Sequence, residues 1–578
     1  MCGIAGYITT NNILTEETLN QFLKCQHHRG PDASGKFIAP GVGLAHNRLS
    51  ILDTSNKANQ PFTSSNGRYE IVYNGEVYNY REFQKQIDVD LRSSSDTEVI
   101  LEMFVRHGHK CVDFFRGMFA FVIFDKEENC YWIFRDRFGI KPLYYYLSND
   151  TFIFSSELKA IADLSEIQGK LSHNKESINH FLHLGFVPSN STIFNEIHVF
   201  PSASYGKIGI EMKLETWSYW KVSDYTNTEK TGFVEAKSKI KELLFSSVEE
   251  HLISDVPVGL FLSGGIDSSL LAAIATKIHS NKIKTFTIGI NGVHNEATYA
   301  RKIAEYLGTE HHESYLSDGI ALEFLNSVNN TYDEPFADTS SIPTMLVSEL
   351  ASKHVKVAMS GEGADEIFLG YNSYNWASRL NNPLIKAGLQ PLQILNRFLN
   401  DPRFSKLDRM LKKSGGSYLA SEIYSAEHGF YSSEEISQIR KTKYKGYEFK
   451  KTSSVMTDQI LFELEVALKD GLLVKMDRAT MKFGLEARVP FLDHRLVEYV
   501  LSLSLEHRFK PNKHILKELL FEMIPASYFD RKKWGFGLSS QHPIKNYILQ
   551  HISNKNKEAN NLPRLFASYV LENNEYVH

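Results

Sequence analysis

The chain of 578 residues has two parts that differ in their pattern of hydrophobic and polar positions. In the first two hundred residues, short apolar runs are separated by turns rich in Gly, Asn and Asp. These runs predict antiparallel strands at 42–45, 69–73, 118–124, 131–135 and 152–155. Amphipathic stretches at 15–25 and 97–106 predict helices between the strands. Paired strands covered by helices indicate an α+β layered structure for this part.

From about residue 231, predicted strands alternate with predicted helices. Apolar strand-like runs lie at 256–262, 285–290, 311–315 and 355–359, and helical runs lie at 270–278 and 297–307. This alternation predicts right-handed βαβ units and a doubly wound parallel sheet. Ligands of such sheets bind beyond the carboxyl ends of the strands, where both Gly-rich turns of this part lie. We therefore expect a first domain at 1–205, a polar linker at 206–230 and a second domain at 231–578.

Composition then narrows the range of functions. Hydrophobic residues make up 42% and charged residues 23% of the chain, as in ordinary globular proteins. The 64 Lys and Arg residues against 68 Asp and Glu residues give a formal net charge of -4, which predicts neither nucleic acid nor a membrane as the main partner. No apolar run reaches the roughly 18 to 20 residues of a membrane helix, and no signal peptide is apparent. We expect a cytoplasmic protein with reduced thiols.

Cys2 is the first candidate for chemistry. If Met1 is removed, Cys2 becomes the first residue, and its own α-amino group, with a reference pKa of about 7.7 to 8.0, can take the thiol proton. Position alone favours a merely structural cysteine, but the surrounding motifs favour a nucleophile. They are C-G-I-A-G at 2–6, H-R-G-P-D at 28–32, N-R-L-S-I at 47–51, Y-N-G-E-V-Y-N at 73–79, S-S-D-T-E at 94–98, G-M-F-A-F at 117–121, D-R-F-G-I-K-P-L-Y-Y at 136–145 and S-S-E-L-K-A-I at 155–161.

Together these motifs resemble the class II glutamine amidotransferase domain. The resemblance implies an αββα N-terminal-nucleophile sandwich over 1–205 that releases ammonia from glutamine through a γ-glutamyl thioester on Cys2. It also implies an oxyanion hole, which needs fixed hydrogen-bond donors, and charged partners for the two ends of glutamine. The implied residues are Asn74 and the backbone of Gly75 for the oxyanion, Arg48 for the carboxylate, and Glu76 and Asp96 for the α-ammonium group.

The segment 258–269, V-G-L-F-L-S-G-G-I-D-S-S, is the second candidate, because it joins a predicted strand to a predicted helix. Gly264 and Gly265 permit a tight turn close to a ligand, and Asp267 is suited to Mg2+. Pyrophosphate would bind the N–H groups at the helix start and the hydroxyls of Ser263, Ser268 and Ser269. No Walker A motif and no full G-x-G-x-x-G motif occurs. The turn resembles instead the PP-loop of ATP pyrophosphatases.

A second Gly-rich turn, S-G-E-G-A-D-E at 360–366, holds three carboxylates that are costly to bury without cations or protons. Further motifs are L-L-V-K-M-D-R-A-T-M at 472–481, E-A-R-V-P-F-L-D at 486–493 and R-K-K-W-G-F-G at 531–537. With the first domain, they resemble the asparagine synthetase (glutamine-hydrolysing) family over nearly the full length.

That resemblance implies ATP and Mg2+ as cofactors of an adenylating second domain. Its implied residues are Leu262, Ile288, Ser360 and Gly361 near the adenine, Glu362 for acyl-adenylate formation and for ammonia, Asp267 and Asp365 for Mg2+, and Lys533, or in another register Lys532, for the departing pyrophosphate. An internal channel for ammonia between the two sites is also implied. The expected partners are glutamine, ATP and a carboxylate, with no nucleic acid, no membrane insertion, and a homodimer as the candidate assembly.

The identity of the carboxylate is the open point. Aspartate is favoured, but 333–344, D-E-P-F-A-D-T-S-S-I-P-T, lacks the arginine that some asparagine synthetases place in a T-T-I-R segment. An α-carboxylate without that bidentate partner would bind more weakly. The alternative is a uronic acid of a surface polysaccharide, amidated by the same mechanism.

Three other classes fit the motifs less well. An amidotransferase that makes glucosamine phosphate or phosphoribosylamine would not need the turn at 263–269. A relative of β-lactam synthetase would lack Cys2. A non-catalytic scaffold would be expected to have lost parts of both motif sets, which are intact here.

Overall fold

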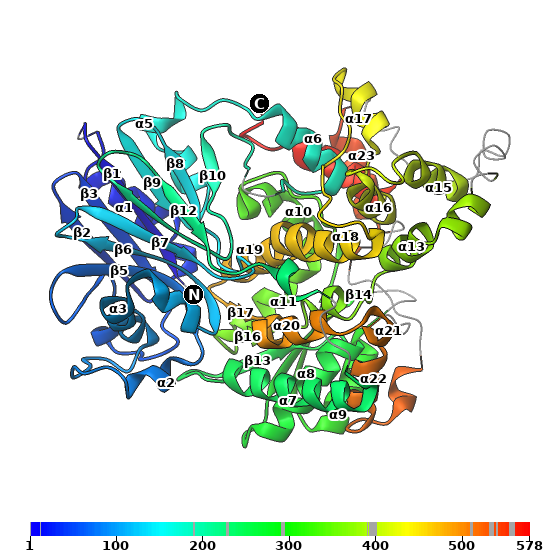
Figure 1. Ribbon diagram of the computed structural model, residues 1–578, viewed down its shortest axis with the longest axis horizontal. Helices are drawn as coiled ribbons and strands as arrows, with labels where there is room; N and C mark the ends of the chain where they lie inside the picture. The colour runs from blue at the N-terminus through cyan, green and yellow to red at the C-terminus, as the bar shows by residue number, and fades with distance from the viewer. Residues whose placement is uncertain are drawn as a thin grey trace.

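The first part of the protein is a β-rich sandwich, and the remainder is an α/β structure that lies beside it (Figure 1). The computed structural model describes residues 2–11, 13–188, 191–226, 231–290, 295–389, 391, 402–508, 513–530, 537–538, 542–553 and 561–577. The N-terminus lies where the two parts meet, near the parallel sheet of the second. Among these described residues, no helix is long and apolar enough to span a membrane.

Two antiparallel six-stranded sheets form the sandwich. The first has the order β10-β8-β9-β1-β3-β2 and the second β12-β11-β7-β6-β5-β4. The first sheet contains β1 (Gly3–Thr9), β2 (Ala33–Ala39), β3 (Val42–Arg48), β8 (Tyr144–Leu147), β9 (Thr151–Ser155) and β10 (Ile197–Val199). The second contains β4 (Phe62–Thr63), β5 (Tyr69–Val77), β6 (Gly117–Asp125), β7 (Cys130–Arg135), β11 (Ser204–Gly209) and β12 (Glu215–Ser218).

Three apolar layers hold the sandwich together. Ile4 of β1 and Val72 of β5 belong to one buried cluster between the two sheets. Because alternate strand residues face opposite sides, a second layer forms outside each sheet. Phe22 packs on the first sheet and Val99 on the second. The helices of this part are α1 (Glu16–Cys25), α2 (Tyr80–Gln84), α3 (Asp96–His107), α4 (Lys159–Ala162), α5 (Ser165–Gln168) and α6 (Lys175–Leu184). The predicted αββα sandwich is confirmed.

Part of the segment that the sequence assigns to a linker lies in the second sheet. Residues 206–209 complete β11, which pairs with β7, and β12 pairs with β11 at the edge of the sheet. The side chains of β12 are all exposed, so the strand has no apolar pattern by which the sequence would predict it. The domain bounds at 205 and 231 stay a prediction.

A five-stranded parallel sheet of order β15-β14-β13-β16-β17 forms the centre of the second part. Its strands are β13 (Val258–Phe261), β14 (Lys284–Ile290), β15 (Glu310–Leu316), β16 (Val357–Met359) and β17 (Glu486–Arg488). Helices α7 (Phe233–His251), α8 (Ile266–Ile278) and α9 (Ala297–Leu307) lie on one side, and α10 (Asp318–Tyr332), α11 (Ser341–Ser352) and α19 (Leu473–Met481) lie on the other (Figure 1). The predicted doubly wound sheet is confirmed.

The remaining helices pack around this sheet or extend from it. They are α12 (Ala364–Ile367), α13 (Asn372–Asn381), α15 (Pro402–Lys412), α16 (Leu419–His428), α17 (Ser433–Arg440), α18 (Val455–Phe462), α20 (His494–Ser502), α21 (Leu505–Arg508), α22 (His514–Phe521), α23 (Ile544–His551) and α24 (Leu562–Glu572). A π-helical stretch, 463–472, joins α18 to α19.

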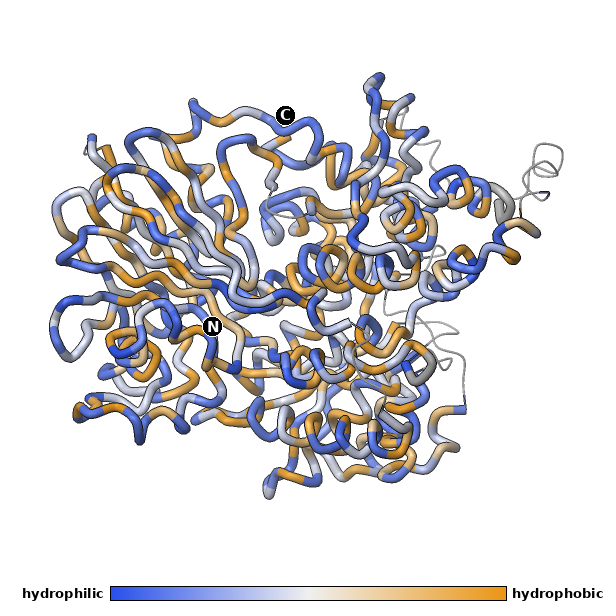
Figure 2. The backbone as a smooth tube through the Cα atoms, viewed as in Figure 1, coloured by the Kyte–Doolittle hydropathy of each residue, from blue (hydrophilic) through white to orange (hydrophobic). Residues whose placement is uncertain are grey.

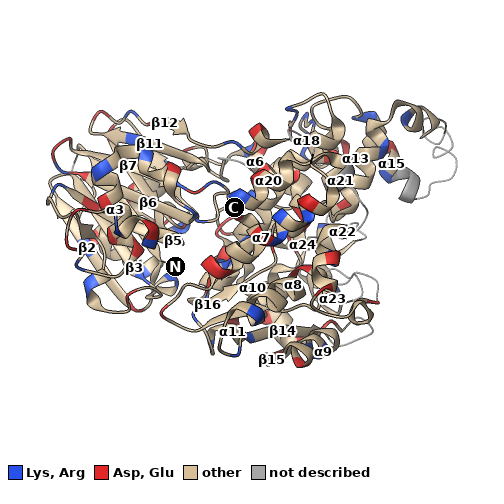
Figure 3. Ribbon diagram, turned by 60° about the horizontal axis from the view of Figure 1, so that its bottom comes forward, with Lys and Arg blue, Asp and Glu red and all other residues tan. Residues whose placement is uncertain are grey.

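Hydropathy and charge follow this architecture. Hydrophobic segments recur along the strands of the sandwich and along the helices beside the parallel sheet (Figure 2). Basic and acidic residues are interspersed over both parts (Figure 3). The near-neutral net charge therefore reflects local mixing of the two signs.

Candidate active sites

Strand pairing places Cys2 at the end of the first sheet that faces the second part. Gly3 of β1 pairs with Asn47 of β3, so Cys2 lies beside Arg48. Cys2 is 8% exposed, and its main-chain N–H donates to the side-chain Oδ1 of Asn74 at 2.9 Å. Burial raises the pKa of the Cys2 thiol, while the N–H of Leu49 and the charge of Arg48 act in the opposite direction. The hydrogen bond joins the two sheets at the predicted nucleophile.

Asn74 and Gly75 lie on β5 at the same place. The Oδ1 of Asn74 is engaged by Cys2, and its Nδ2 is buried without a partner among the described residues. A buried donor without a partner is costly, and it fits a site where negative charge develops on a bound substrate. A Cβ on Gly75 would lie 2.2 Å from the main-chain oxygen of Met118 on β6, so only glycine fits there.

The three residues predicted for the charged ends of glutamine are all buried near this end of the sheet. The terminal nitrogens of Arg48 donate to the main-chain oxygens of Leu52 and Ser55 and to Asn59, which holds the guanidinium against the loop after β3. Asp96, at the start of α3, accepts from the hydroxyl of Tyr73 at 2.7 Å.

Glu76 connects this site to the second part of the protein. Its Oε2 accepts a hydrogen bond from Nη2 of Arg488 on β17 at 3.0 Å, and its Oε1 has no partner within the described structure. Burial raises the pKa of Glu76 well above its usual value, although Arg488 acts against that shift. The free oxygen suits a cationic group, but the roles of Glu76, Asp96 and Arg48 toward glutamine stay predictions.

The second site is a cavity of about 850 Å³ at the carboxyl ends of β13, β14 and β16. Both Gly-rich turns line it, because β13 and β16 are adjacent and parallel. Gly264 has φ +71, and a Cβ there would lie 2.9 Å from the main-chain nitrogen of Ala300. The predicted nucleotide-binding residues that line the cavity are Leu262, Ser263, Gly264, Gly265, Asp267, Ser268, Ile288, Ser360 and Gly361.

Two predicted positions differ from this group. Ser269 is fully buried on α8 and is absent from the residues that line the cavity. Lys533 and Lys532 lie outside the described residues, so the structure places neither of them.

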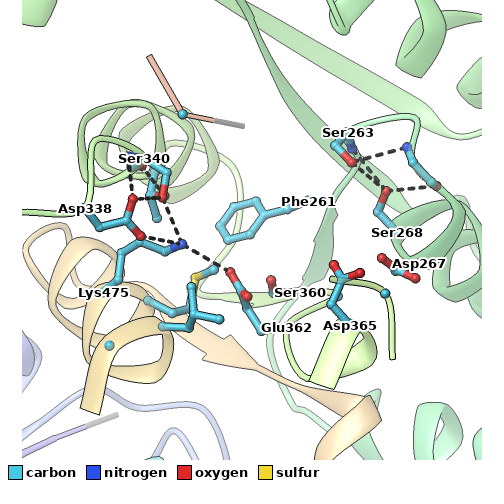
Figure 4. A pocket seen from close by; sticks show the side chains of 18 of the residues that line it. Phe261, Ser263, Asp267, Ser268, Asp338, Ser340, Ser360, Glu362, Asp365 and Lys475 are labelled. Carbon is cyan, nitrogen blue, oxygen red and sulfur yellow. Dashed lines mark hydrogen bonds and ion pairs between the residues drawn. The ribbon is translucent and has the colours of Figure 1, made fainter. Parts of the chain in front are cut away.

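The two predicted Mg2+ ligands both lie beside the ammonium group of Lys513. Nζ of Lys513 lies 2.5 Å from Oδ2 of Asp267 and 2.6 Å from Oδ1 of Asp365. Burial alone would lower the pKa of Lys513, but the two carboxylates hold it above its usual value. Carboxylate oxygens are hard ligands, and these two already flank one cation. The donor set therefore fits Mg2+. Figure 4 shows Asp267 and Asp365 facing each other beside Ser268.

Glu362 lies between the end of the cavity that holds Asp267 and Asp365 and a second charged group, formed by Lys475 and Asp338 (Figure 4). Its Oε1 lies 3.7 Å from Nζ of Lys475, which also donates to Oγ of Ser340 at 3.0 Å and lies 3.4 Å from Oδ2 of Asp338. Burial raises the pKa of Glu362, and Lys475 moderates that shift. Burial also acts to raise the pKa of Asp338, but Lys475 and Ser340 hold it below its usual value.

Sequence reasoning missed Lys513, Lys475 and Asp338 as members of the site. Lys475 and Asp338 both lie within segments that the sequence singled out, 472–481 and 333–344, but nothing in the spacing of either segment indicates that the two would meet. Lys513 precedes α22 in a segment without a recognised motif. Their signal is charge pairing across elements, which appears only after folding.

A short chain of contacts links the two sites. Nε of Arg29 donates to the main-chain oxygen of Cys2 at 3.2 Å, and its two terminal nitrogens donate to Asp477 at 2.9 and 3.1 Å. Asp477 lies on α19, two residues after the cavity-lining Lys475. The carbonyl of the predicted nucleophile is therefore two hydrogen-bonded side chains away from the helix that forms one wall of the cavity.

Comparison with known proteins matches both parts of the chain. The asparagine synthase family matches residues 239–572, and the glutamine amidotransferase domain matches residues 1–220. A Methanocaldococcus jannaschii protein, provisionally named a glutamine-hydrolyzing asparagine synthetase, is 34% identical over 83% of this chain and 98% of its own. Glutamine-hydrolyzing asparagine synthetase 1 of Bacillus subtilis is 30% identical over 99% of this chain and 92% of its own. Asparagine synthetase B of Escherichia coli is 26% identical over 96% of this chain and 86% of its own.

Proposed function

The chain belongs to the asparagine synthase family, and from that premise we propose that it converts aspartate to asparagine with ammonia released from glutamine. The proposal assigns glutamine hydrolysis to the site at Cys2 and amide synthesis to the cavity at the parallel sheet. Both sites lie in one chain, and Arg29 and Asp477 connect the carbonyl of Cys2 to α19, which forms one wall of the cavity.

In the first reaction, the sulfur of Cys2 attacks the side-chain amide carbon of glutamine. The oxygen of that amide gains negative charge in the tetrahedral intermediate, and Nδ2 of Asn74 with the N–H of Gly75 would stabilise it. Collapse of the intermediate releases ammonia and leaves a thioester, which water hydrolyses to glutamate and the free thiol. Within the described residues, Nδ2 of Asn74 has no hydrogen-bond partner and lies beside Cys2, which supports this assignment.

In the second reaction, the side-chain carboxylate of aspartate attacks the α-phosphorus of ATP and displaces pyrophosphate. Ammonia then attacks the acyl carbon of the resulting adenylate, and AMP leaves as asparagine forms. The phosphates would bind at Ser263, Gly265 and Ser268, which line the cavity, and the hydroxyls of the two serines lie 3.1 Å apart. Mg2+ would be held by Asp267 and Asp365 and would neutralise phosphate charge.

Glu362 and the lysines of the cavity complete the proposal. Burial raises the pKa of Glu362, which makes its carboxylate a stronger base than usual, so Glu362 would take the proton that ammonia loses. Lys513 would move from the two carboxylates toward the phosphates when a metal ion takes its place.

One observation carries this proposal above the others: two Gly-rich turns on adjacent parallel strands face a cavity that also holds a converging carboxylate pair. An amidotransferase without an adenylation step would have no use for such a cavity. A binding protein would have no use for the nucleophile site beside it.

The test is pyrophosphate release with MgATP and ammonium chloride, measured with aspartate and with a panel of uronic acids and nucleotide-linked uronic acids. We expect aspartate-dependent pyrophosphate release together with equal amounts of AMP and asparagine. Activity with a uronic acid and none with aspartate would retain the mechanism and transfer the protein to polysaccharide modification. Release of ADP and phosphate would contradict the adenylation step.

A further inference from the structure

The end of the cavity away from the phosphate-binding turn holds a cation and an anion side by side. Nζ of Lys475 lies 3.4 Å from Oδ2 of Asp338, and Ser340 connects the two. In Figure 4 this group of three is separated from Ser263 and Ser268 by Phe261 and Glu362. All three side chains line the cavity, although they come from α19 and from the segment before α11.

The group is fixed in position and open to the cavity. Ser340 donates from its hydroxyl to Oδ1 of Asp338 at 2.7 Å, and its main-chain N–H donates to the same oxygen at 2.8 Å. The side chain of Lys475 is only 6% exposed, whereas that of Asp338 is 33% exposed. The carboxylate therefore remains accessible to a ligand, while the ammonium group is held by its neighbours.

We propose that Lys475 and Asp338 bind the head group of an α-amino acid, with Lys475 on its α-carboxylate and Asp338 on its α-ammonium group. This assignment rests on the proposed function and names the residues that select aspartate for it. An amino acid presents opposite charges on neighbouring atoms, which matches the neighbouring opposite charges of this pair. The side-chain carboxylate of aspartate would then extend past Glu362 toward the phosphates.

The same pair disfavours a uronic acid. A uronic acid carries a carboxylate and neutral hydroxyl groups, so it has no cation for Asp338. Its binding would remove water from that carboxylate without supplying a compensating charge, which is unfavourable in a partly buried site. Asp338 thus acts against sugar acids as well as for amino acids.

Two fragments of aspartate separate the two contacts. Succinate is aspartate without its ammonium group, and β-alanine is aspartate without its α-carboxylate. The experiment measures the KM of aspartate and the inhibition constants of both fragments for Lys475→Met, Lys475→Arg and Asp338→Asn. Lys482→Met is the matched control, because Lys482 follows the same helix but donates to Thr331 outside the cavity.

We expect each variant to affect a different fragment of aspartate. Lys475→Met weakens the binding of aspartate and succinate about 10- to 100-fold, the range for hydrogen bonds to charged groups. It leaves the inhibition constant of β-alanine unchanged. Asp338→Asn weakens the binding of aspartate and β-alanine to a similar degree and does not weaken the binding of succinate. Lys475→Arg restores part of the loss, and Lys482→Met has wild-type constants. Glutamine hydrolysis at Cys2, measured on each variant, reports that the protein is folded.

Equal losses for all three ligands in either variant would overturn the assignment, since a merely structural ion pair would affect them alike. Unchanged constants in both folded variants would overturn it too. In either case, aspartate-dependent pyrophosphate release by the wild type would leave the proposed function standing. If the wild type released no pyrophosphate with aspartate, the proposed function would fail, and this assignment with it.

Discussion

The two polar ends of the Asn74 side chain have different tasks. The oxygen accepts from the main chain of Cys2, which orients the amide, and the nitrogen faces a buried space without a protein partner among the described residues. A donor that is held in place before the substrate arrives needs no reorganisation when charge develops. The hydrogen bond to Cys2 therefore prepares the oxyanion site as well as the nucleophile.

Asn74→Ala should lower the kcat of glutamine hydrolysis about 100- to 1,000-fold with a small change in KM, because the lost donor acts mainly in the transition state. Steady-state glutaminase assays measure this directly. Ammonia-dependent synthesis is the control and should be unchanged. A variant that raised KM alone would indicate that Asn74 only binds glutamine.

Cys2→Ala should abolish glutamine-dependent synthesis and spare synthesis from ammonium chloride, because the thiol serves only the first reaction. Product formation with each nitrogen donor is the measurement. Cys25→Ala is the matched control, since Cys25 is a partly buried thiol on α1, outside the proposed site. If Cys2→Ala lost both activities while remaining folded, the two-site scheme would be wrong.

Glu366 predicts a pH dependence of stability. Burial, and next the charge of Asp365, raise its pKa to about 8. Between its unfolded pKa near 4.5 and about 8, the folded protein binds the proton that the unfolded chain has lost. Stability from this group therefore falls as pH rises, with a slope of about 1.4 kcal/mol per pH unit.

In Glu366→Gln this contribution disappears, so the variant should gain stability relative to the wild type from pH 5 to pH 8. Urea unfolding of both proteins at each pH is the measurement. The hydroxyl of Tyr371, which donates to Oε1 of Glu366 at 2.7 Å, can donate to the amide oxygen as well. Parallel stability curves would show that Glu366 is ionised in the folded protein.

At the scale of elements, the turn between β13 and α8 shows how local chain geometry forms a site. Gly264 adopts φ +71, a conformation that other residues rarely take, and it approaches the start of α9 closely. The turn therefore brings the first residues of α8, Ile266 to Ser268, to the wall of the cavity. Conformation and close approach are two separate reasons for glycine at this position.

The two reasons can be separated with a second glycine of the same conformation. Gly308 has φ +70, and apart from its chain neighbours no atom of the described residues lies within 4 Å of its ideal Cβ. Gly308→Ala should therefore cost only the conformational term of about 1 kcal/mol. Gly264→Ala should cost more and should raise the KM of ATP, since its Cβ would meet Ala300. Urea unfolding and ATP kinetics of both variants measure this, and equal effects would refute the close-approach argument.

Elements with a local signal were predicted closely, whereas elements defined by their neighbours were not. The predicted helix at 297–307 agrees with α9, and the predicted strands at 285–290 and 311–315 agree with β14 and β15 to within a residue. In contrast, β12 exists only because β11 offers an edge to pair with. The period of side-chain burial marks an amphipathic element, and it is absent from an edge strand exposed along its length.

At the scale of the whole molecule, buried ion pairs join the two parts of the chain. Arg29 is fully buried and makes a two-pronged contact with Asp477, which is 448 positions away in the sequence. Arg488 makes a similar connection to Glu76. These contacts fix the interface between the predicted nucleophile and α19, which forms one wall of the cavity.

Arg29→Met should lower the free energy of unfolding by about 3 to 5 kcal/mol, because it leaves the carboxylate of Asp477 buried without its partner. The double variant Arg29→Met/Asp477→Leu should lose less than the sum of the two single variants. Lys239→Ala, which removes an exposed pair with Glu242, should cost less than about 1 kcal/mol. Additive losses in the denaturant titrations would show that the two residues do not stabilise each other.

The sequence by itself determined the two fold classes, the family and the positions of the motifs. These features depend on residues that are close together in the chain, such as the turn at 263–265 or the pair Asn74 and Gly75. Spacing over a few residues sets backbone conformation and the side of an element that is buried. It therefore predicts which turns face a ligand.

Only the tertiary structure decided which charges meet. Lys513 bridges Asp267 and Asp365, Lys475 lies beside Asp338, and Arg29 reaches Asp477. No period or motif spacing indicates these contacts, because each depends on how separate helices and strands pack against one another. Electrostatic energy depends on distance in space and on burial, and both are set by folding rather than by order in the chain.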